Sequence, residues 1–365
     1  MKIDLKAFSG FTLPDTSNEE WVHTSVTPIA DISYETAPAH FSVQAPNLPS
    51  SVVVSKNKTF TSVHSLDDAF SKLNQSLSKE GFHILVPKNV KVAEPIEITF
   101  QVSTNGHPLM VSPRNLVQVE EGGEVTIVER FESNGKNVSF TNSVTQIQAG
   151  PNATVRHIKF QNEGFQNFHI GTVSAHQSQN SQFHSIAIHL GGKLVRSNTH
   201  TRFENEGGEC SMNGFFLTSQ DQHTDNHTLI DHAKPHCTSR ELYKGILTDR
   251  SRAVFDGKII VRPNAQKTDA RQTSRNLLLS ENALIDTTPR LEIFADDVKC
   301  AHGATIGNLD ENALFYFRSR GIDELTAKRI LTYAFADEIL SQIPQPFLRE
   351  TISNEVKKRL HEVNR

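Results

Sequence analysis

The chain has 365 residues, of which 36% are hydrophobic, and it carries a formal net charge of −4. This charge argues against a general attraction to nucleic acid or to an acidic membrane, and no run of about 18 apolar residues is present that could span a bilayer. The hydrophobic fraction is low for this length. It favours a narrow core with much surface, as in a solenoid, over a thick two-layer globule.

Residues 1–80 are expected to form a mixed amino-terminal segment. The chain opens without the apolar run of a secretory signal peptide, and its three cysteines are not spaced like those of a disulfide-rich secreted module. We therefore expect a cytoplasmic protein. Residues 65–68 (SLDD) resemble a capping box, and Phe70, Leu73 and Leu77 follow on one helical face, which predicts one short helix.

Residues 81–307 are expected to form a core of strands. Short alternating runs such as residues 125–128 and 183–188 predict strands, and corners that contain Gly or Asn separate them. The interval between these corners is nearly constant, since they begin at Gly123, Asn152, Ser181, Gly208 and His236. A similar cue begins at Arg252 and returns at Asn282 after much the same interval, but it is out of step with the first series.

A period of this length, built only from strands and turns, predicts a β-solenoid in which each coil lies on the previous one. A β-sandwich or jelly roll is the alternative, because its turn signals also recur every 8–12 residues. The constant interval spans several strands, and it favours the solenoid.

Stacked coils would bring residues one period apart to about the 4.8 Å spacing of neighbouring strands. Three pairs of possible ligands share one sequence separation that is close to this period, namely Cys210 and Cys237, His157 and His184, and His200 and His227. Such pairs could bind a metal, but side-chain ladders that fill or line a solenoid are the more common arrangement. We favour the ladders.

Residues 308–365 are expected to form a helical domain. Residues 308–311 (NLDE) are a helix start signal and Gly321 is a suitable stop. Asp323 opens a second helix, and a proline-containing break at residues 344–346 precedes a third. These helices would cap the open edge of a solenoid or dock a partner.

Seventeen histidines raise the question of a metal site. The chain contains no HExxH, CxxC or EF-hand pattern, no Gly-rich phosphate-binding loop and no GxSxG motif. We therefore expect no nucleotide hydrolysis by this chain. A hydrolytic metal centre could be drawn from one segment, although solvated or ladder histidines explain it more simply; its members are His223, His227, His232, His236, Asp221, Asp225 and Asp231.

Cys300 and His302 form the most distinctive local feature. Two residues apart, they would point to the same side of an extended strand. A thiolate and an imidazole are suitable ligands for iron or an iron–sulfur species. Taken alone, the pair is better explained by a structural cysteine beside a hydrogen-bonded histidine.

The sequence around this pair contains five distinctive runs. They are PHCTSRELYKG (235–245), VRPNAQKTDA (261–270), RNLLLS (275–280), DDVKCAHGAT (296–305) and LFYFRSRGI (314–322). With these runs, residues 231–322 resemble the signature half of the SufB/SufD family of the SUF iron–sulfur cluster assembly system, which makes a role in ligand binding more plausible for the pair. Residues 18–21 (NEEW) are similar to a family motif near the amino terminus. The SufD branch fits better, since the SufB pattern has a carboxylate where this chain has Gly303.

The resemblance implies a mainly β protein with a right-handed parallel β-helix core and helical ends. It implies a non-catalytic scaffold that pairs with a SufB-like subunit and binds a SufC-like ATPase through residues 308–365. This chain alone would hold no cofactor stably. A transient iron–sulfur cluster would form in the complex, and ATP would act only through the SufC-like partner. His302 is the best candidate for the nascent cluster site at the SufB interface, and Cys300 is a weaker one.

Two other functions stay open from the sequence. The first is an independent homodimeric scaffold, because solenoid edges can pair with their own copies. The second is a carbohydrate-active enzyme on a β-helix, such as a polysaccharide lyase or esterase. That function needs a basic or carboxylate constellation along one groove, whereas the acidic residues of this chain are scattered, so we favour it least.

Overall fold

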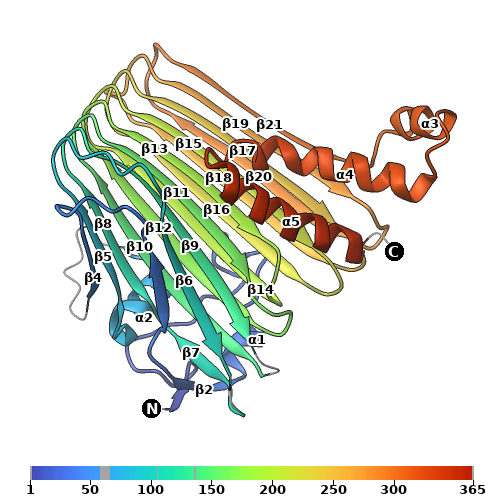
Figure 1. Cartoon of the computed structure of the whole chain (residues 1–365), viewed down its shortest axis with the longest axis horizontal. Helices are drawn as coiled ribbons and strands as arrows, with labels where there is room; N and C mark the ends of the chain where they lie inside the picture. The colour runs from blue at the N-terminus through green and yellow to red at the C-terminus, as the bar shows by residue number, and fades with distance from the viewer. Residues whose placement is uncertain (1, 58–65, 105, 135–136, 364–365) are drawn as a thin grey trace.

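A computed structural model shows two long parallel sheets that face each other and helices on their outer faces (Figure 1). The chain alternates between the sheets, so each coil contributes one strand to each of them. The predicted β-solenoid is therefore confirmed, and the sandwich alternative is wrong. The residues that the structure describes are 2–57, 66–104, 106–134 and 137–363.

The first sheet runs in spatial order through β1 (Lys2–Asp4), β2 (Ser33–Thr36), β7 (Leu109–Val111), β10 (Ser139–Ala149), β12 (Phe168–Gln177), β14 (Leu194–Phe203), β16 (His223–His232), β18 (Arg252–Val261) and β20 (Leu284–Ile293). Beside β10 it also carries β8 (Arg114–Val119), β5 (Gly81–Val86) and β4 (Val53–Asn57). From β7 to β20 every pair along the main path is parallel.

The second sheet runs through β3 (Phe41–Gln44), β6 (Ile96–Ser103), β9 (Glu124–Asn134), β11 (Thr154–Asn162), β13 (Gln182–His189), β15 (Glu209–Thr218), β17 (Thr238–Leu247), β19 (Asp269–Leu278) and β21 (Lys299–Gly307). Its strands are parallel from β6 onward, and β3 is antiparallel to β6.

The two series of sequence corners mark the two sheets. The first series lies at or just before the starts of β9, β11, β13, β15 and β17, all in the second sheet. The cues at Arg252 and Asn282 lie at or just before β18 and β20 in the first sheet, which explains why they are out of step. Asn152, Asn180 and His236 have φ values of 58°, 52° and 60° at such corners. Asn tolerates this left-handed conformation better than most residues.

The three predicted stacked pairs are wrong. In the observed register Cys210 aligns with Ser239, His157 with Ser185 and His200 with Leu229. Each observed partner therefore lies slightly further along the chain than the predicted one. Corner length varies from coil to coil, and the backbone hydrogen bonds, not a fixed period, decide which side chains meet.

The helices cover the outer faces of the sheets (Figure 1). The amino-terminal segment and α2 pack on the first sheet, where Phe70 and Leu73 are buried as predicted. Helices α4 and α5 pack on the second sheet through residues such as Ile339 and Ile352. The helices are η1 (Glu19–Trp21), α1 (Thr27–Ala30), α2 (Ala69–Leu77), α3 (Glu311–Ser319), α4 (Glu324–Leu340) and α5 (Pro346–Val363).

The helix starts partly differ from the predictions. Asp68 caps α2 by accepting a hydrogen bond from the Ser71 amide, whereas Ser65 of the predicted capping box lies outside the described residues. Asp310, not Asn308, caps α3, and Asp323 caps α4 as predicted. The expectation that these helices cap the open edge is wrong, since α4 and α5 lie along a sheet face instead.

No helix within the described ranges has the length and apolar character required to cross a membrane.

Candidate functional site

Cys300 and His302 lie on β21, the last strand of the second sheet. Among the described strands, β21 pairs with β19 on one side only, and most of its residues are exposed to solvent. β20 is likewise the last strand of the first sheet. We call β20 and β21 together the open end of the solenoid. The sequence placed the thiol and imidazole on one strand, and the structure places that strand at an edge.

The two candidate ligands differ in their environments. The Cys300 side chain is half-buried and packs against the apolar cluster between the sheets. Burial raises the pKa of its thiol, so at neutral pH Cys300 is a thiol and must lose a proton before it can bind a metal. His302 is exposed. The imidazole is therefore the more accessible donor of the two.

Behind His302 lies a row of polar side chains that the sequence did not reveal. The strand register aligns His302 with Gln272 on β19, and Gln272 with Glu241 on β17. Both inner residues are buried, and Gln272 Nε2 donates a 2.7 Å hydrogen bond to Glu241 Oε2. Burial raises the pKa of Glu241 to about 7. These coils are longer than the intervals between the first series of sequence corners, so counting back from residue 302 by that period would have missed both positions.

The rim of the open end is apolar. Phe294 is 59% exposed and Ile306 is 49% exposed, and Leu284 and Ile293 on β20 are exposed as well. Exposed hydrophobic side chains beside unpaired strand edges mark a surface suited to another protein chain.

Within the described ranges, no group of three or more His, Cys, Asp or Glu side chains is arranged to hold a metal ion. Cys300 and His302 can supply two donors at most, whereas an iron–sulfur cluster commonly takes about four. A cluster at the open end would therefore need ligands from another chain.

The segment of histidines and aspartates between residues 221 and 236 serves a structural purpose instead. Buried Asp225 on β16 accepts hydrogen bonds from Arg196 Nη1 at 2.8 Å and from Thr24 Oγ1 at 2.6 Å, and its other oxygen lies 2.9 Å from His227 Nε2. Burial alone would raise the pKa of Asp225, but His227 and Arg196 hold it far below its usual range. His232 is buried against Ser239.

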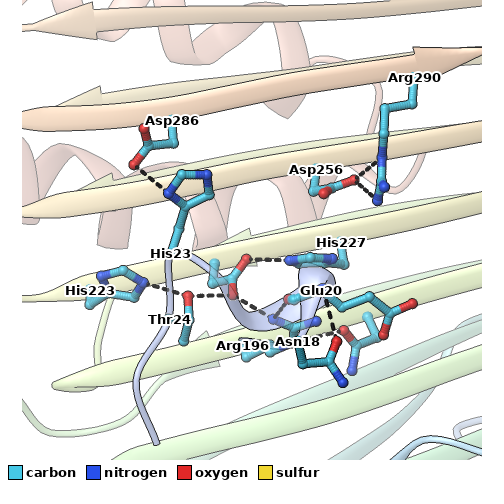
Figure 2. A network of polar contacts seen from close by, with 12 residues as sticks. Asn18, Glu20, His23, Thr24, Arg196, His223, His227, Asp256, Asp286 and Arg290 are labelled. Atoms are coloured by element: carbon cyan, nitrogen blue, oxygen red, sulfur yellow. Dashed lines mark hydrogen bonds and ion pairs between the residues drawn. The ribbon is translucent and has the colours of Figure 1, made fainter. Parts of the chain in front are cut away.

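Residues 18–24, which we call the amino-terminal strap, lie across the outer face of the first sheet (Figure 2). The guanidinium of Arg196 lies 3.8 Å from the centre of the Trp21 ring and donates to the Glu20 carbonyl oxygen at 2.7 Å. Near the open end, Arg290 bridges Glu19 and Asp256. The NEEW motif thus holds the amino-terminal strap against the first sheet of the same chain, a role that the sequence alone did not reveal.

A second buried polar group lies between the sheets in the amino-terminal coils. His157 Nε2 lies 2.9 Å from Glu129, and His169 Nδ1 lies 2.8 Å from Glu163. Lys159 lies near both carboxylates, and burial lowers its pKa to about 8. All five side chains are shielded from solvent. They have no open approach for a macromolecular substrate, so they are poor candidates for a hydrolytic site.

Helix α3 stands apart from the sheets (Figure 1). None of its residues is buried, and Phe315 is 73% exposed. Three hydrophobic side chains on the neighbouring helices are also exposed, namely Leu325, Ile330 and Phe347. Surface of this kind is typical of a docking site for another protein.

A family model described as "SUF system FeS cluster assembly, SufBD core domain" matches residues 100–335. That range contains most of the solenoid, β21 and α3. The chain belongs to the SufBD family. This confirms the family predicted from the signature runs of the carboxyl-terminal half.

Curated relatives agree with the SufBD assignment. The chain is 37% identical to an iron–sulfur cluster assembly SufBD family protein of Synechocystis, over 79% of this chain and 66% of that protein. It is 34% identical to the iron–sulfur cluster assembly protein SufD of Escherichia coli, over 80% and 70%. It is 36% identical to protein ABCI7, chloroplastic, of Arabidopsis thaliana, over 80% and 62%. The matched region is thus about two thirds of the length of these relatives.

Proposed function

We propose that this chain is a non-catalytic scaffold subunit for iron–sulfur cluster assembly that acts in a SufBCD-type complex. The nascent cluster would form where the open end meets a SufB-like subunit, with His302 as a ligand and Cys300 as a secondary candidate. The observation that carries the proposal is the position of His302, exposed on the edge strand of the described sheet. A ligand in that position can be shared between two chains.

The edge of β21 supports pairing with a second protein. Alternate backbone N–H and C=O groups of an edge strand have no ladder partner, and an added strand satisfies them. The apolar rim around Phe294 and Ile306 would lose contact with water in the same step. Strand pairing and burial of the apolar rim together favour a stable interface over a transient one.

The cluster is the cargo of such a complex and not a resident cofactor of this chain. The SufB-like subunit would supply the remaining ligands, because the described residues around Cys300 offer too few. ATP would act through a SufC-like subunit, consistent with the lack of a phosphate-binding loop in the sequence. The exposed apolar surface of α3 and α4 is the proposed contact with that ATPase.

The test is the substitution His302→Ala in a complex co-purified from the native host, with cluster formation followed by visible absorbance and by iron and sulfide content. We expect assembly to fall at least about tenfold, because a metal ligand is lost. The matched control is His107→Ala, an exposed histidine on a loop before β7. Normal assembly by the His302→Ala complex would remove His302 from the mechanism.

A homodimeric scaffold is the second candidate, because the same edge and rim could pair with a second copy about a two-fold axis. Weighing the isolated chain in solution, alone and after addition of a SufB-like chain, separates the two. Replacement of a homodimer by a heterodimer supports the first proposal. A homodimer that persists in the presence of the SufB-like chain supports the second.

A further inference from the structure

The Glu241–Gln272 pair has no evident structural necessity. Two buried polar side chains sit between the sheets at a place where the preceding strand carries Met212 in the same row. Burying a carboxyl group costs free energy unless it is fully hydrogen-bonded. Here Gln272 Oε1 is buried without a hydrogen-bond partner among the described residues. An apolar pair would fill this space at lower cost, so another role is needed to explain it.

The direction of the Gln272 amide is set by Glu241. At about pH 8, above its pKa of about 7, Glu241 is mostly ionised and only accepts hydrogen bonds, so the NH₂ group of Gln272 is the group that faces it. This leaves the carbonyl oxygen, Oε1, for the following strand. The residue on that strand in register with Gln272 is His302, about one strand spacing of 4.8 Å away on the same face.

Gly257 on β18 makes room for this amide. A Cβ atom at position 257 would collide with Gln272 Nε2 and would also lie 2.8 Å from the Phe255 ring and 2.9 Å from Gln272 Cδ. The backbone of Gly257 is not in the left-handed region, so glycine is not needed there for its conformation. Glycine at this position leaves room for two side chains, Phe255 of its own strand and Gln272 from the second sheet.

We propose that Gln272 is a positioning residue for His302, accepting the N–H of one imidazole nitrogen so that the other nitrogen is left free to bind iron. Histidine ligands usually donate their second N–H to an acceptor that fixes the tautomer and the orientation of the ring. Glu241 anchors Gln272 in turn. This inference rests on the proposed function, because it assigns a role to the same histidine.

The test substitutes Gln272→Met, which keeps the length of the side chain and removes both polar atoms. The matched control is Asn276→Leu, an amide on the inner face of the same strand that is in register with Ile306 instead of His302. Gly257→Ala displaces the Gln272 amide without altering its chemistry, but it also crowds the Phe255 ring, so its result is read together with that of Gln272→Met.

The first readout needs no cluster. In the isolated chain with ¹⁵N-labelled histidine, at about pH 8 where an ordinary imidazole is neutral, the His302 signals are identified by their loss in His302→Gln. We expect a single dominant tautomer in the parent protein and in Asn276→Leu, and a mixture of tautomers in Gln272→Met and Gly257→Ala. An unchanged tautomer in both Gln272→Met and Gly257→Ala would overturn the inference.

The second readout is cluster assembly in the complex. We expect Gln272→Met to slow assembly about tenfold, the lower end of what removal of such a partner costs, and Asn276→Leu to have little effect. If His302→Ala stops assembly while Gln272→Met changes neither tautomer nor rate, only the positioning role fails. If the tautomer responds to Gln272→Met but His302→Ala assembles normally, the hydrogen bond stands and the proposed function fails.

Discussion

The two ends of the solenoid are finished differently. At the amino-terminal end the second sheet stops at β3, which is four residues long and antiparallel to its neighbour, and the first sheet carries the antiparallel pairs β1–β2 and β4–β5. At the carboxyl-terminal end β20 and β21 are ten and nine residues long and run parallel to their neighbours. Short reversed strands are a common way to protect a sheet edge. This chain closes one end and leaves the other available.

The strap lies on the outer face of the strands from β14 to β20, which lead to the open end, and breaking its anchor should have the largest effect. Asp225→Ala leaves the buried guanidinium of Arg196 without its counter-ion. We expect a loss of about 3–5 kcal/mol in the free energy of unfolding, measured by urea denaturation. Asp286→Ala removes a half-exposed partner of His23 and should cost less than about 1 kcal/mol. Equal losses in the two variants would show that the strap is not held through Asp225.

Near the open end, Glu241 should make the free energy of unfolding depend on pH. Its folded-state pKa of about 7 lies above the ordinary value of 4.5, so its contribution to stability is complete below about pH 4.5 and is lost as the pH rises through 7. Relative to Glu241→Gln, the parent protein should lose up to about 3 kcal/mol between about pH 5 and pH 8. Urea denaturation at both pH values measures this difference.

Glu129 on β9, in the amino-terminal coils, supplies a control in which stability should change with pH in the opposite direction. Burial opposes ionisation of Glu129, but the hydrogen bonds from His157 and Thr145 and the charges of His157 and Lys159 together outweigh it and lower its pKa. Its contribution is present above the unfolded pKa and is lost as the pH falls through the folded value. Relative to Glu129→Gln, the parent protein should therefore gain stability with rising pH. The same pH trend in both comparisons would contradict the assignment for Glu241.

A charge on the open edge should give the smallest effect, and it should act on association alone. Ile306→Lys places an ammonium group on the apolar rim of β21. We expect binding to a SufB-like chain to weaken about tenfold, or about 1.4 kcal/mol, with the unfolding free energy changed by less than about 0.5 kcal/mol. Val43→Lys on β3 is the matched substitution at the closed end. If the two variants bind the partner equally well, the open end is not the interface.

The sequence predicted the repeating architecture because its signals are local. Asn152 and His236 recur where each coil must turn with a left-handed backbone, and a corner of this kind needs no knowledge of the rest of the fold. The family also followed from residues 231–322, where signature runs are dense. Asp323 predicted the start of α4 for the same local reason.

The missed features depend on contacts that no local pattern encodes. Thr24 bonds to Asp225, which lies far along the chain from it, and neither residue is unusual in its own segment. The predicted pairing of Cys210 with Cys237 was wrong because the coil between the two strands is longer than the assumed period, so Cys210 aligns with Ser239 instead. Gln272 drew no attention as a buried amide until the register set it beside His302.

Parallel coils also constrain how this protein can change over time. Gaining or losing one whole coil preserves which side chains face inward and moves the terminal strand by a single spacing of about 4.8 Å. A one-residue insertion within β21 ahead of His302 would instead turn the imidazole from the inner face to the outer face. The length of the chain can therefore change by whole coils while the His302 side chain keeps its direction, and the distance between the strap and His302 changes without a change in either segment.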